Sequence, residues 1–235
     1  MTVMHFPPGD YRFLASPGRP FSSGVIADEG MTLVRATFRR PRPLEEGLTA
    51  AQRHVESLSR PVTAIAAFEL RSPKQFTPEG FDAFNAPYVE RLGKVGLTAG
   101  PDQPTARTNV ASTMVSVPEP SVYAFTYTVP EANAGPAFRM SGSPETRRTG
   151  PDEDKLRSII ETLSERMAEL GVDWEMATAI NLYSAELPLA GMDEELARSF
   201  GEGSLHGVTW YPSLPPVQEL RFELDVRRVS QELFL

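Results

Sequence analysis

The chain lacks cysteine and any long apolar run. With no Cys among its 235 residues, disulfides and cysteine-based metal or nucleophile sites are excluded. No apolar run approaches the ~20 residues that span a bilayer. The first eight residues, Met1 to Pro8, have neither the basic flank nor the apolar core of a signal peptide. We therefore expect a cytoplasmic protein with no membrane partner.

Positive charge is scarce, and so are motifs for cofactors. The chain carries 23 Lys and Arg against 31 Asp and Glu, and no basic run exceeds a pair. A nucleic-acid partner is not expected, because such binding needs a basic patch. The three histidines, His5, His54 and His206, show no metal-ligand spacing. Gly-rich phosphate loops and a Gly-x-Ser-x-Gly elbow are missing too, so we expect no metal and no cofactor.

Alternating and helical spacings of apolar residues predict the elements of the first half. The expected strands are Tyr11–Leu14, Phe21–Ala27, Met31–Arg39, Val62–Leu70, Ala106–Val117 and Ser121–Val129, after a loose lead-in over residues 1–10. The expected helices are 44–58 and one that Thr77 caps and Pro78 opens. Met31–Arg39 is expected to form a hairpin with its predecessor, and Pro87 to kink or end the second helix.

The pattern starts again after Glu131. A strand over Phe138–Ser141 precedes a helix that Pro151 opens and Gly171 ends. The remaining elements are strand Glu175–Ser184, a short helix on Met192, Leu196 and Phe200, and strands His206–Ser213 and Glu219–Val229. Helix, strand, helix, strand, strand thus occurs twice, offset by about 115 residues.

This repeat predicts an α+β fold of two units, residues 1–130 and 131–235, each a mixed sheet with helices on one face. The second unit is shorter and lacks an opening strand. We expect the first unit to cover the sheet edge that this leaves bare.

Three stretches of the first half carry a family pattern: Thr63–Phe68, Phe81–Tyr88, and Ala106–Val110 followed by Val117-Pro118. Together they resemble the RidA/YjgF family, the reactive intermediate/imine deaminases also labelled endoribonuclease L-PSP. Residues 138–229 look like a second, more degenerate copy, with Ser141-Gly142 and Leu214-Pro215 at two family turns. The resemblance implies tandem chorismate-mutase-like units, and a homo-oligomer, a trimer of tandem chains, with ligand clefts between units.

The chemistry that the resemblance implies is hydrolysis of small enamines or imines derived from amino acids. A guanidinium binds the carboxylate of such substrates bidentately, and the matching arginine is Arg107. Asn85 also matches the family, and Phe21 stands at its aromatic loop position without the hydroxyl. We expect these three residues to contact the ligand.

The family's acid, which would handle water or proton transfer, is not found at its counted position. That position reads Ala124 in the first half and Arg221 in the second, where Glu219 and Glu223 flank it. The arginine position of the second half reads His206. The first half thus keeps the anchor, the second keeps possible acids, and one cleft could combine the two.

Each candidate also has a purely structural interpretation. Arg107 could cap a helix or pair with a surface acid, Asn85 could bond backbone freed beside Pro87, and His206 could be a turn histidine. Three functions stay open: a hydrolytic deaminase of small enamine or imine carboxylates, a non-catalytic binder of small carboxylates, and an assembly or partner-binding protein with vestigial clefts. The missing acid weighs against the first, and the intact Ala-Arg-Thr stretch against the third.

Overall fold

The computed structural model describes residues 1–186 and 193–235, and within them thirteen strands form one mixed sheet. The strands of the first half are β1 (Val3–Phe6), β2 (Tyr11–Leu14), β3 (Gly24–Ala27), β4 (Met31–Pro43), β5 (Ile65–Ser72), β6 (Ala106–Ser112) and β7 (Ser121–Pro130). Those of the second half are β8 (Phe138–Met140), β9 (Ser143–Pro144), β10 (Ala179–Ser184), β11 (Val208–Leu214), β12 (Phe222–Arg228) and β13 (Gln231–Phe234).

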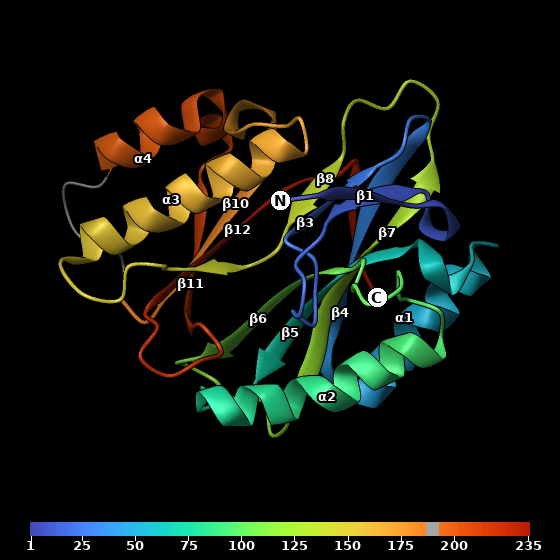
Figure 1. Cartoon of the computed structure of the whole chain (residues 1–235), viewed down its shortest axis with the longest axis horizontal. Helices are drawn as coiled ribbons and strands as arrows, with labels where there is room; N and C mark the ends of the chain where they lie inside the picture. The colour runs from blue at the N-terminus through green and yellow to red at the C-terminus, as the bar shows by residue number, and fades with distance from the viewer. Residues whose placement is uncertain (187–192) are drawn as a thin grey trace.

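Four α-helices pack on the described part of this sheet: α1 (Leu44–Ser57), α2 (Pro78–Lys94), α3 (Asp152–Glu169) and α4 (Asp193–Phe200) (Figure 1). The Thr77 side chain caps α2 by accepting from the Gly80 N–H at 3.1 Å, as predicted. Of the two outcomes predicted at Pro87, a kink or an early end of the helix, the early end is wrong, because α2 continues to Lys94. Buried Tyr88 and Leu92 hold its last turns on the sheet despite the missing N–H. The α4 bounds match the predicted short helix, and Met192 lies outside the described residues.

The strand order of the first half recurs in the second. The sheet runs β1-β2-β3-β8-β12-β10-β11-β6-β5-β7-β4-β13, with β9 beside β12. Thus β6-β5-β7-β4 in one half corresponds to β11-β10-β12-β8 in the other. In both, the first pair is parallel and the next two are antiparallel. β6 and β11 join antiparallel at the centre. The mixed α+β fold is as predicted, and the division at residue 130 stays a prediction.

The outer strand of each half of the sheet pairs with a strand from the other half of the chain. β3 lies antiparallel to β8, so the first half covers the edge that the missing strand leaves, as predicted. β13, which the sequence did not indicate, lies parallel to β4. The predicted hairpin is therefore wrong, since β4 pairs with β7 and β13 while β3 satisfies the backbone groups of β8. The loose lead-in is also wrong, because β1 pairs with β2.

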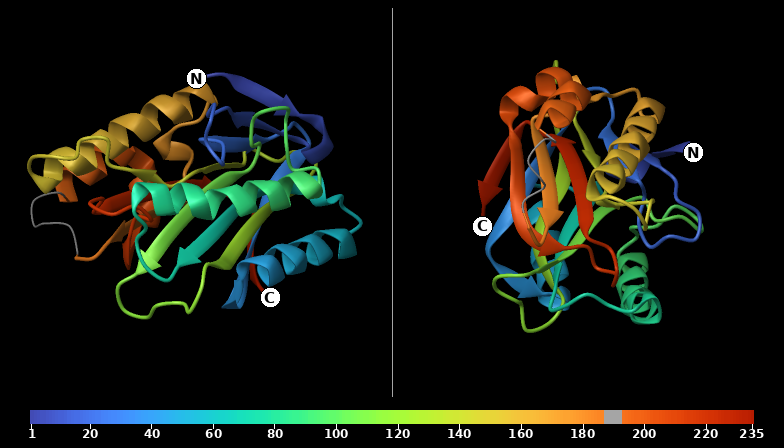
Figure 2. Two further views of the ribbon diagram at one scale, coloured as in Figure 1. Left: turned by 60° about the horizontal axis from the view of Figure 1, so that its bottom comes forward. Right: turned by 90° about the vertical axis from the view of Figure 1, so that its left-hand side faces the viewer.

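Two hydrophobic clusters form the core. The first joins α1 and α2 to β4, β5 and β7, and the second joins α3 and α4 to β8, β10 and β12. Figure 2 shows the two helix pairs at different ends of the molecule. β3 serves both clusters, because Val25 and Ala27 face the first and Ile26 the second. Within the described ranges, no helix combines the length and apolar character needed to cross a membrane.

Candidate active site

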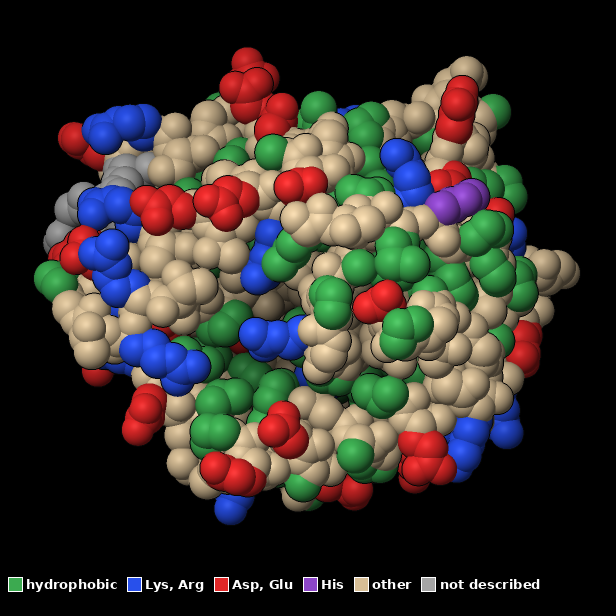
Figure 3. All heavy atoms as spheres, viewed as in Figure 1, with side chains coloured by type: hydrophobic (Ala, Val, Ile, Leu, Met, Phe, Trp, Pro, Cys, Tyr) green, Lys and Arg blue, Asp and Glu red, His purple; other side chains and the backbone are tan. Residues whose placement is uncertain are grey.

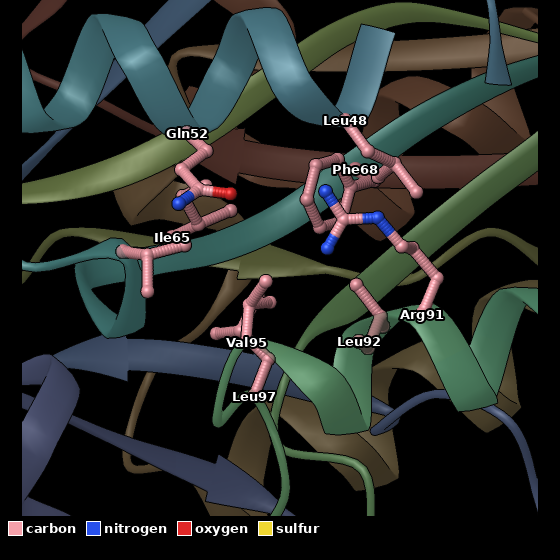
Figure 4. Close-up of a pocket in the computed structure, with 9 residues that line it drawn as sticks. Leu48, Gln52, Ile65, Phe68, Arg91, Leu92, Val95 and Leu97 are labelled. Carbon is pink, nitrogen blue, oxygen red and sulfur yellow. The ribbon is translucent and has the colours of Figure 1, made fainter. Parts of the chain in front are cut away.

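A cleft of about 620 Å³ lies where the two halves meet. Its walls come from the segment before β3, the first turn of α2, β6, the segment after β8, α3 and β12 with its preceding loop. Figure 3 shows a hollow with hydrophobic side chains at its floor and Lys or Arg side chains at its rim. A second gap, between α1 and α2, holds only about 10 Å³ and is filled by side chains such as Arg91 and Phe68 (Figure 4).

β6 places Arg107 at this cleft. Its backbone N–H donates to Ser141 Oγ at 2.9 Å, and its carbonyl accepts from the Gly142 N–H at 3.0 Å. These bonds join β6 to the segment after β8, so the sheet curls and brings the halves together. The Arg107 side chain lines the cleft, and the residue is 3 % exposed.

Four aromatic rings surround the Arg107 guanidinium. Its Cζ lies 4.5 Å from the ring centroid of Phe21, 4.9 Å from Tyr88, 5.5 Å from Phe81 and 5.9 Å from Phe84. Three of these rings share one face of α2, because they recur at spacings of three and four. The faces of these rings attract the guanidinium cation electrostatically. This attraction does not use up the N–H donors of the guanidinium.

The Arg107 guanidinium has no acceptor in good hydrogen-bond geometry among the described residues, and the Tyr88 hydroxyl is the one side-chain group close enough to act on its pKa as a weak hydrogen-bond partner. Nη1 and Nη2 are buried and have no hydrogen-bond partner in the part of the chain that the structure describes. Burial lowers the pKa of Arg107 to about 10, while Tyr88 and Glu223 act against this shift. The group is therefore a cation at neutral pH with two donors free for a ligand oxygen.

Glu223 brings a carboxyl group from β12 to the same cleft. It is 2 % exposed, and burial raises its pKa well above the ordinary value of 4.5. The neighbouring Asp225 adds to the rise, and Arg107 opposes it. Glu223 thus holds a proton at pH values where a surface glutamate has lost it, as a general acid must.

Asp225 lies behind Glu223 among a set of hydrogen-bond donors. Its carboxylate oxygens accept from Arg139 Nη2 and Thr108 Oγ1, both at 2.8 Å, and from Asn181 Nδ2 and the Tyr183 hydroxyl, both at 2.9 Å. Four hydrogen bonds, one of them within an ion pair, fix the position of this carboxylate. The Asp225 carboxylate in turn raises the pKa of Glu223 and favours the neutral form of that residue.

Gly142 makes room for the Glu223 carboxyl. A Cβ at residue 142 would overlap the Oε1 atom of Glu223 and lie 2.7 Å from its Cδ. Only glycine fits there while Glu223 keeps this position. The Ser-Gly step at residues 141–142, seen in the sequence as a family turn, therefore shapes the acid's surroundings.

The cleft brings together some of the residues singled out from the sequence. Arg107 and Phe21 both line it, and of the two candidate acids Glu223 lies inside while Glu219 is exposed outside. Asn85 is not part of the lining. It is buried on α2, and its Oδ1 has no partner among the described residues.

The other positions weighed in the sequence lie outside the cleft. Ala124 is fully buried on β7, Arg221 forms an ion pair with Asp152 at 3.0 Å, and His206 is exposed in a 3-10 turn. Sequence reasoning missed three arginines that do line the cleft, Arg19, Arg148 and Arg166. No spacing ties them together, since they come from three distant segments. Within residues 1–186 and 193–235, no three acidic or histidine side chains gather to hold a metal ion.

Comparison with known proteins identifies the family. The model of the 2-aminomuconate deaminase CnbZ family matches residues 3–233. The chain belongs to this family. It is also 34 % identical, over 249 aligned residues and 98 % of both chains, to the 2-amino-5-chloromuconate deaminase of Comamonas testosteroni.

Two solved structures resemble parts of this CnbZ-family chain more remotely. A YjgF/YER057c/UK114 family member from Mycobacterium tuberculosis is 12 % identical in sequence and has a TM-score of 0.27. The superposition covers 41 % of this chain and 81 % of the M. tuberculosis protein. A chorismatase is 12 % identical in sequence and has a TM-score of 0.47. The superposition covers 92 % of this chain and 79 % of the chorismatase chain. At these values, neither indicates an activity for this chain.

Proposed function

We propose that the protein is a hydrolytic deaminase that converts a 2-amino-2-enoate, of the 2-aminomuconate kind, into ammonia and a 2-oxo acid. The observation that carries the proposal is that Arg107, with two unpaired donors, and Glu223, with a raised pKa, line one cleft. The activity named for the relative from Comamonas testosteroni supports the same reaction type.

Arg107 is assigned the carboxylate beside the amino-bearing carbon. Two parallel N–H···O bonds from Nη1 and Nη2 match the geometry of a carboxylate. The bonds form in a desolvated cage of aromatic rings, where charge-assisted hydrogen bonds are stronger than in water. Binding would satisfy the two donors that have no partner in the described chain.

Glu223 is assigned the proton transfers. Its carboxyl donates a proton to C3 of the enamine, the C2=C3 electron pair forms the new C3–H bond, and the nitrogen lone pair forms the C2=N iminium bond. Water then adds to C2 while the Glu223 carboxylate takes one of its protons. The Glu223 carboxyl then gives the proton it took from water to the nitrogen. The C2–N bond breaks, ammonia leaves, and C2–OH becomes C2=O as the Glu223 carboxylate takes the hydroxyl proton, which restores the starting carboxyl.

The alternative function, a non-catalytic carboxylate binder, was supported by the absence of a predicted acid near Arg107. Glu223 removes that ground, because it faces the same cleft as Arg107. We therefore rank the deaminase first. The trimer that the family resemblance implies stays a prediction.

The proposal is tested by following ammonia and 2-oxo acid release from 2-aminomuconate made in situ. Glu223→Gln is expected to lower kcat by roughly 10²–10⁴-fold, the usual share of a general acid–base group. Arg107→Lys is expected to lower kcat/KM, because an ammonium lacks the planar fork. Glu219→Gln, at an exposed position outside the cleft, is the control and should leave both constants unchanged.

The pH profile gives a second readout. Because Glu223 acts first as an acid, kcat/KM should fall as the pH rises through its raised pKa, and Glu223→Gln should remove this limb. Full activity in Glu223→Gln, or no release of ammonia by the wild type, would contradict the proposal.

A further inference from the structure

We propose that Arg166, together with Arg19 and Arg148, forms a second anion subsite in the cleft and makes the protein selective for linear dicarboxylates. The inference rests on the proposed function, because it takes Arg107 as the anchor of the first carboxylate. It names what the remainder of the cleft recognises.

The three arginines converge from separate elements on one cavity. Arg166 projects from α3, Arg19 from the loop before β3 and Arg148 from the loop before α3, and all three line the cleft that holds Arg107. Arg166 and Arg19 lie close enough for their charges to interact, since Arg19 adds to the lowering of the Arg166 pKa that burial causes. Two neighbouring cations on a concave wall attract an anion.

These cations lack a direct ion-pair partner among the described residues, and Glu165 offsets only part of the lowering of the Arg166 pKa that burial and Arg19 cause. Arg19, Arg148 and Arg166 form no ion pair within the described residues. Arg166 donates one long hydrogen bond to Ser143 Oγ, at 3.4 Å, and its buried Nε has no partner there. Donors left free in a cleft are available to a ligand carboxylate.

Three acids of the described chain line the cleft, and they differ in how far each can offset the arginines. Glu145 accepts from the backbone N–H groups of Arg221 at 2.7 Å and Phe222 at 3.1 Å. The raised pKa of Glu223 favours its neutral form, and Asp82 is exposed to solvent on α2. The N-terminal ammonium of Met1 is paired with Glu169 at 3.4 Å. The arginines therefore set the sign of this part of the cleft.

The size of the cleft agrees with a ligand longer than a three- or four-carbon imino acid. A volume of about 620 Å³ lies in the range of sites for extended small molecules. A short monocarboxylate held at Arg107 would leave the arginine wall uncontacted. A linear chain with a carboxylate at each end would satisfy both cationic groups.

Equilibrium binding of two matched ligands tests the inference without turnover. trans,trans-Muconate and sorbate share a six-carbon diene and differ by one terminal carboxylate. Calorimetry on the wild type should give muconate a Kd at least about tenfold below that of sorbate, as expected for one charge-assisted pair. Arg166→Gln should remove most of this ratio while changing the sorbate Kd by less than about twofold.

Two further variants make the result specific. Arg147→Gln changes an exposed arginine next to the cleft that pairs with Asp154 at 3.4 Å, and it should leave the muconate-to-sorbate ratio unchanged. Arg19→Gln, at the exposed rim, should lower the ratio by a smaller factor and serves if Arg166→Gln does not fold. A ratio near one in the wild type, or an unchanged ratio in Arg166→Gln or its substitute, overturns the inference.

The same experiment separates this inference from the proposed function. Arg107→Gln should weaken muconate and sorbate alike, because both keep the carboxylate that Arg107 binds. If Arg107→Gln changes neither ligand, the anchor and the proposed function fail. A ratio that still depends on Arg166 would then sustain the second subsite alone.

Discussion

Arg107 occupies a position that is unfavourable for the free protein. A buried group without a hydrogen-bond partner costs about 1–3 kcal/mol of stability, and more when it is charged. The aromatic cage offsets part of this cost through cation–π attraction. Such unfavourable arrangements concentrate at sites where a ligand later supplies the missing partner.

Gly142→Ala is the sharpest test at the residue scale. The added Cβ would overlap Glu223 Oε1, so the carboxyl must move while the fold is kept. We expect kcat/KM to fall by roughly 10²-fold or more, as for loss of a positioned acid, with a change in melting temperature of a few degrees. Steady-state assays and thermal unfolding measure the two effects.

Gly93→Ala is the matched control for that change. Gly93 lies in the last turn of α2. The nearest atom to a Cβ added at this position would be Thr98 Cγ2, at 3.7 Å, which is an ordinary van der Waals distance. This variant should keep activity and gain slightly in stability, because alanine favours helix. Equal activities for Gly142→Ala and Gly93→Ala would mean that Glu223 does not need its present position.

At the scale of the elements, the halves are linked by exchanged edge strands. β3 completes the second half along β8, and β13 completes the first half along β4. Leu14 and Ile26 also enter the hydrophobic cluster of the second half. The second half therefore depends on residues from the beginning of the chain for both its sheet and its core.

A fragment of residues 131–235 should consequently fail to fold alone. Without β3, the N–H and C=O groups of β8 that face away from β12 lose their partners, and the cluster under α3 loses apolar contacts. Urea denaturation followed by circular dichroism should give no cooperative transition for the fragment, against one for the full chain. A soluble fragment with a sharp transition would show that the exchanged strand is dispensable.

On the scale of the whole molecule, a buried charge network crosses between the halves. Glu69 on β5 accepts from Arg35 Nε at 2.6 Å and Nη2 at 2.8 Å, and Arg139 Nη2 lies 3.3 Å from it. Arg139 also binds Asp225 at 2.8 Å. Burial alone would raise the pKa of Glu69, but Arg35 and Arg139 outweigh it and hold the pKa well below 4.5.

Glu69→Gln should therefore lower the free energy of unfolding by about 3–5 kcal/mol at neutral pH, because it leaves buried arginines without their counter-charge. A lowered pKa in the folded state stabilises the protein above pH 4.5, and this contribution is lost as the pH falls through the folded-state pKa. Urea denaturation at several pH values should thus show a difference between wild type and variant that is constant above pH 5 and shrinks below about pH 4. A difference that grows in acid would contradict this assignment.

The sequence by itself determined most elements and their repeated order, and it singled out Arg107. Periodicity located α1, α3 and β2, because apolar spacing and turn residues act locally. The repeat predicted that the first half covers a bare sheet edge of the second, without saying which strand forms that edge. Arg107 and Phe21 could be selected from a family pattern in the first half. The candidate acids in the second half could be narrowed to Glu219 and Glu223, since both flank the counted position, Arg221, on the last predicted strand.

Only the tertiary structure decided which of these groups meet. β3 pairs with β8 and β13 pairs with β4, and in each case the two strands are more than a hundred residues apart in the chain. No local signal in the sequence encodes such a long-range pairing. The curl of the sheet, bonded from β6 to Gly142, then places an arginine of one half beside a glutamate of the other. Arg166 joins them for the same reason, because the surfaces of a cleft are set by how whole elements pack and not by distance along the chain.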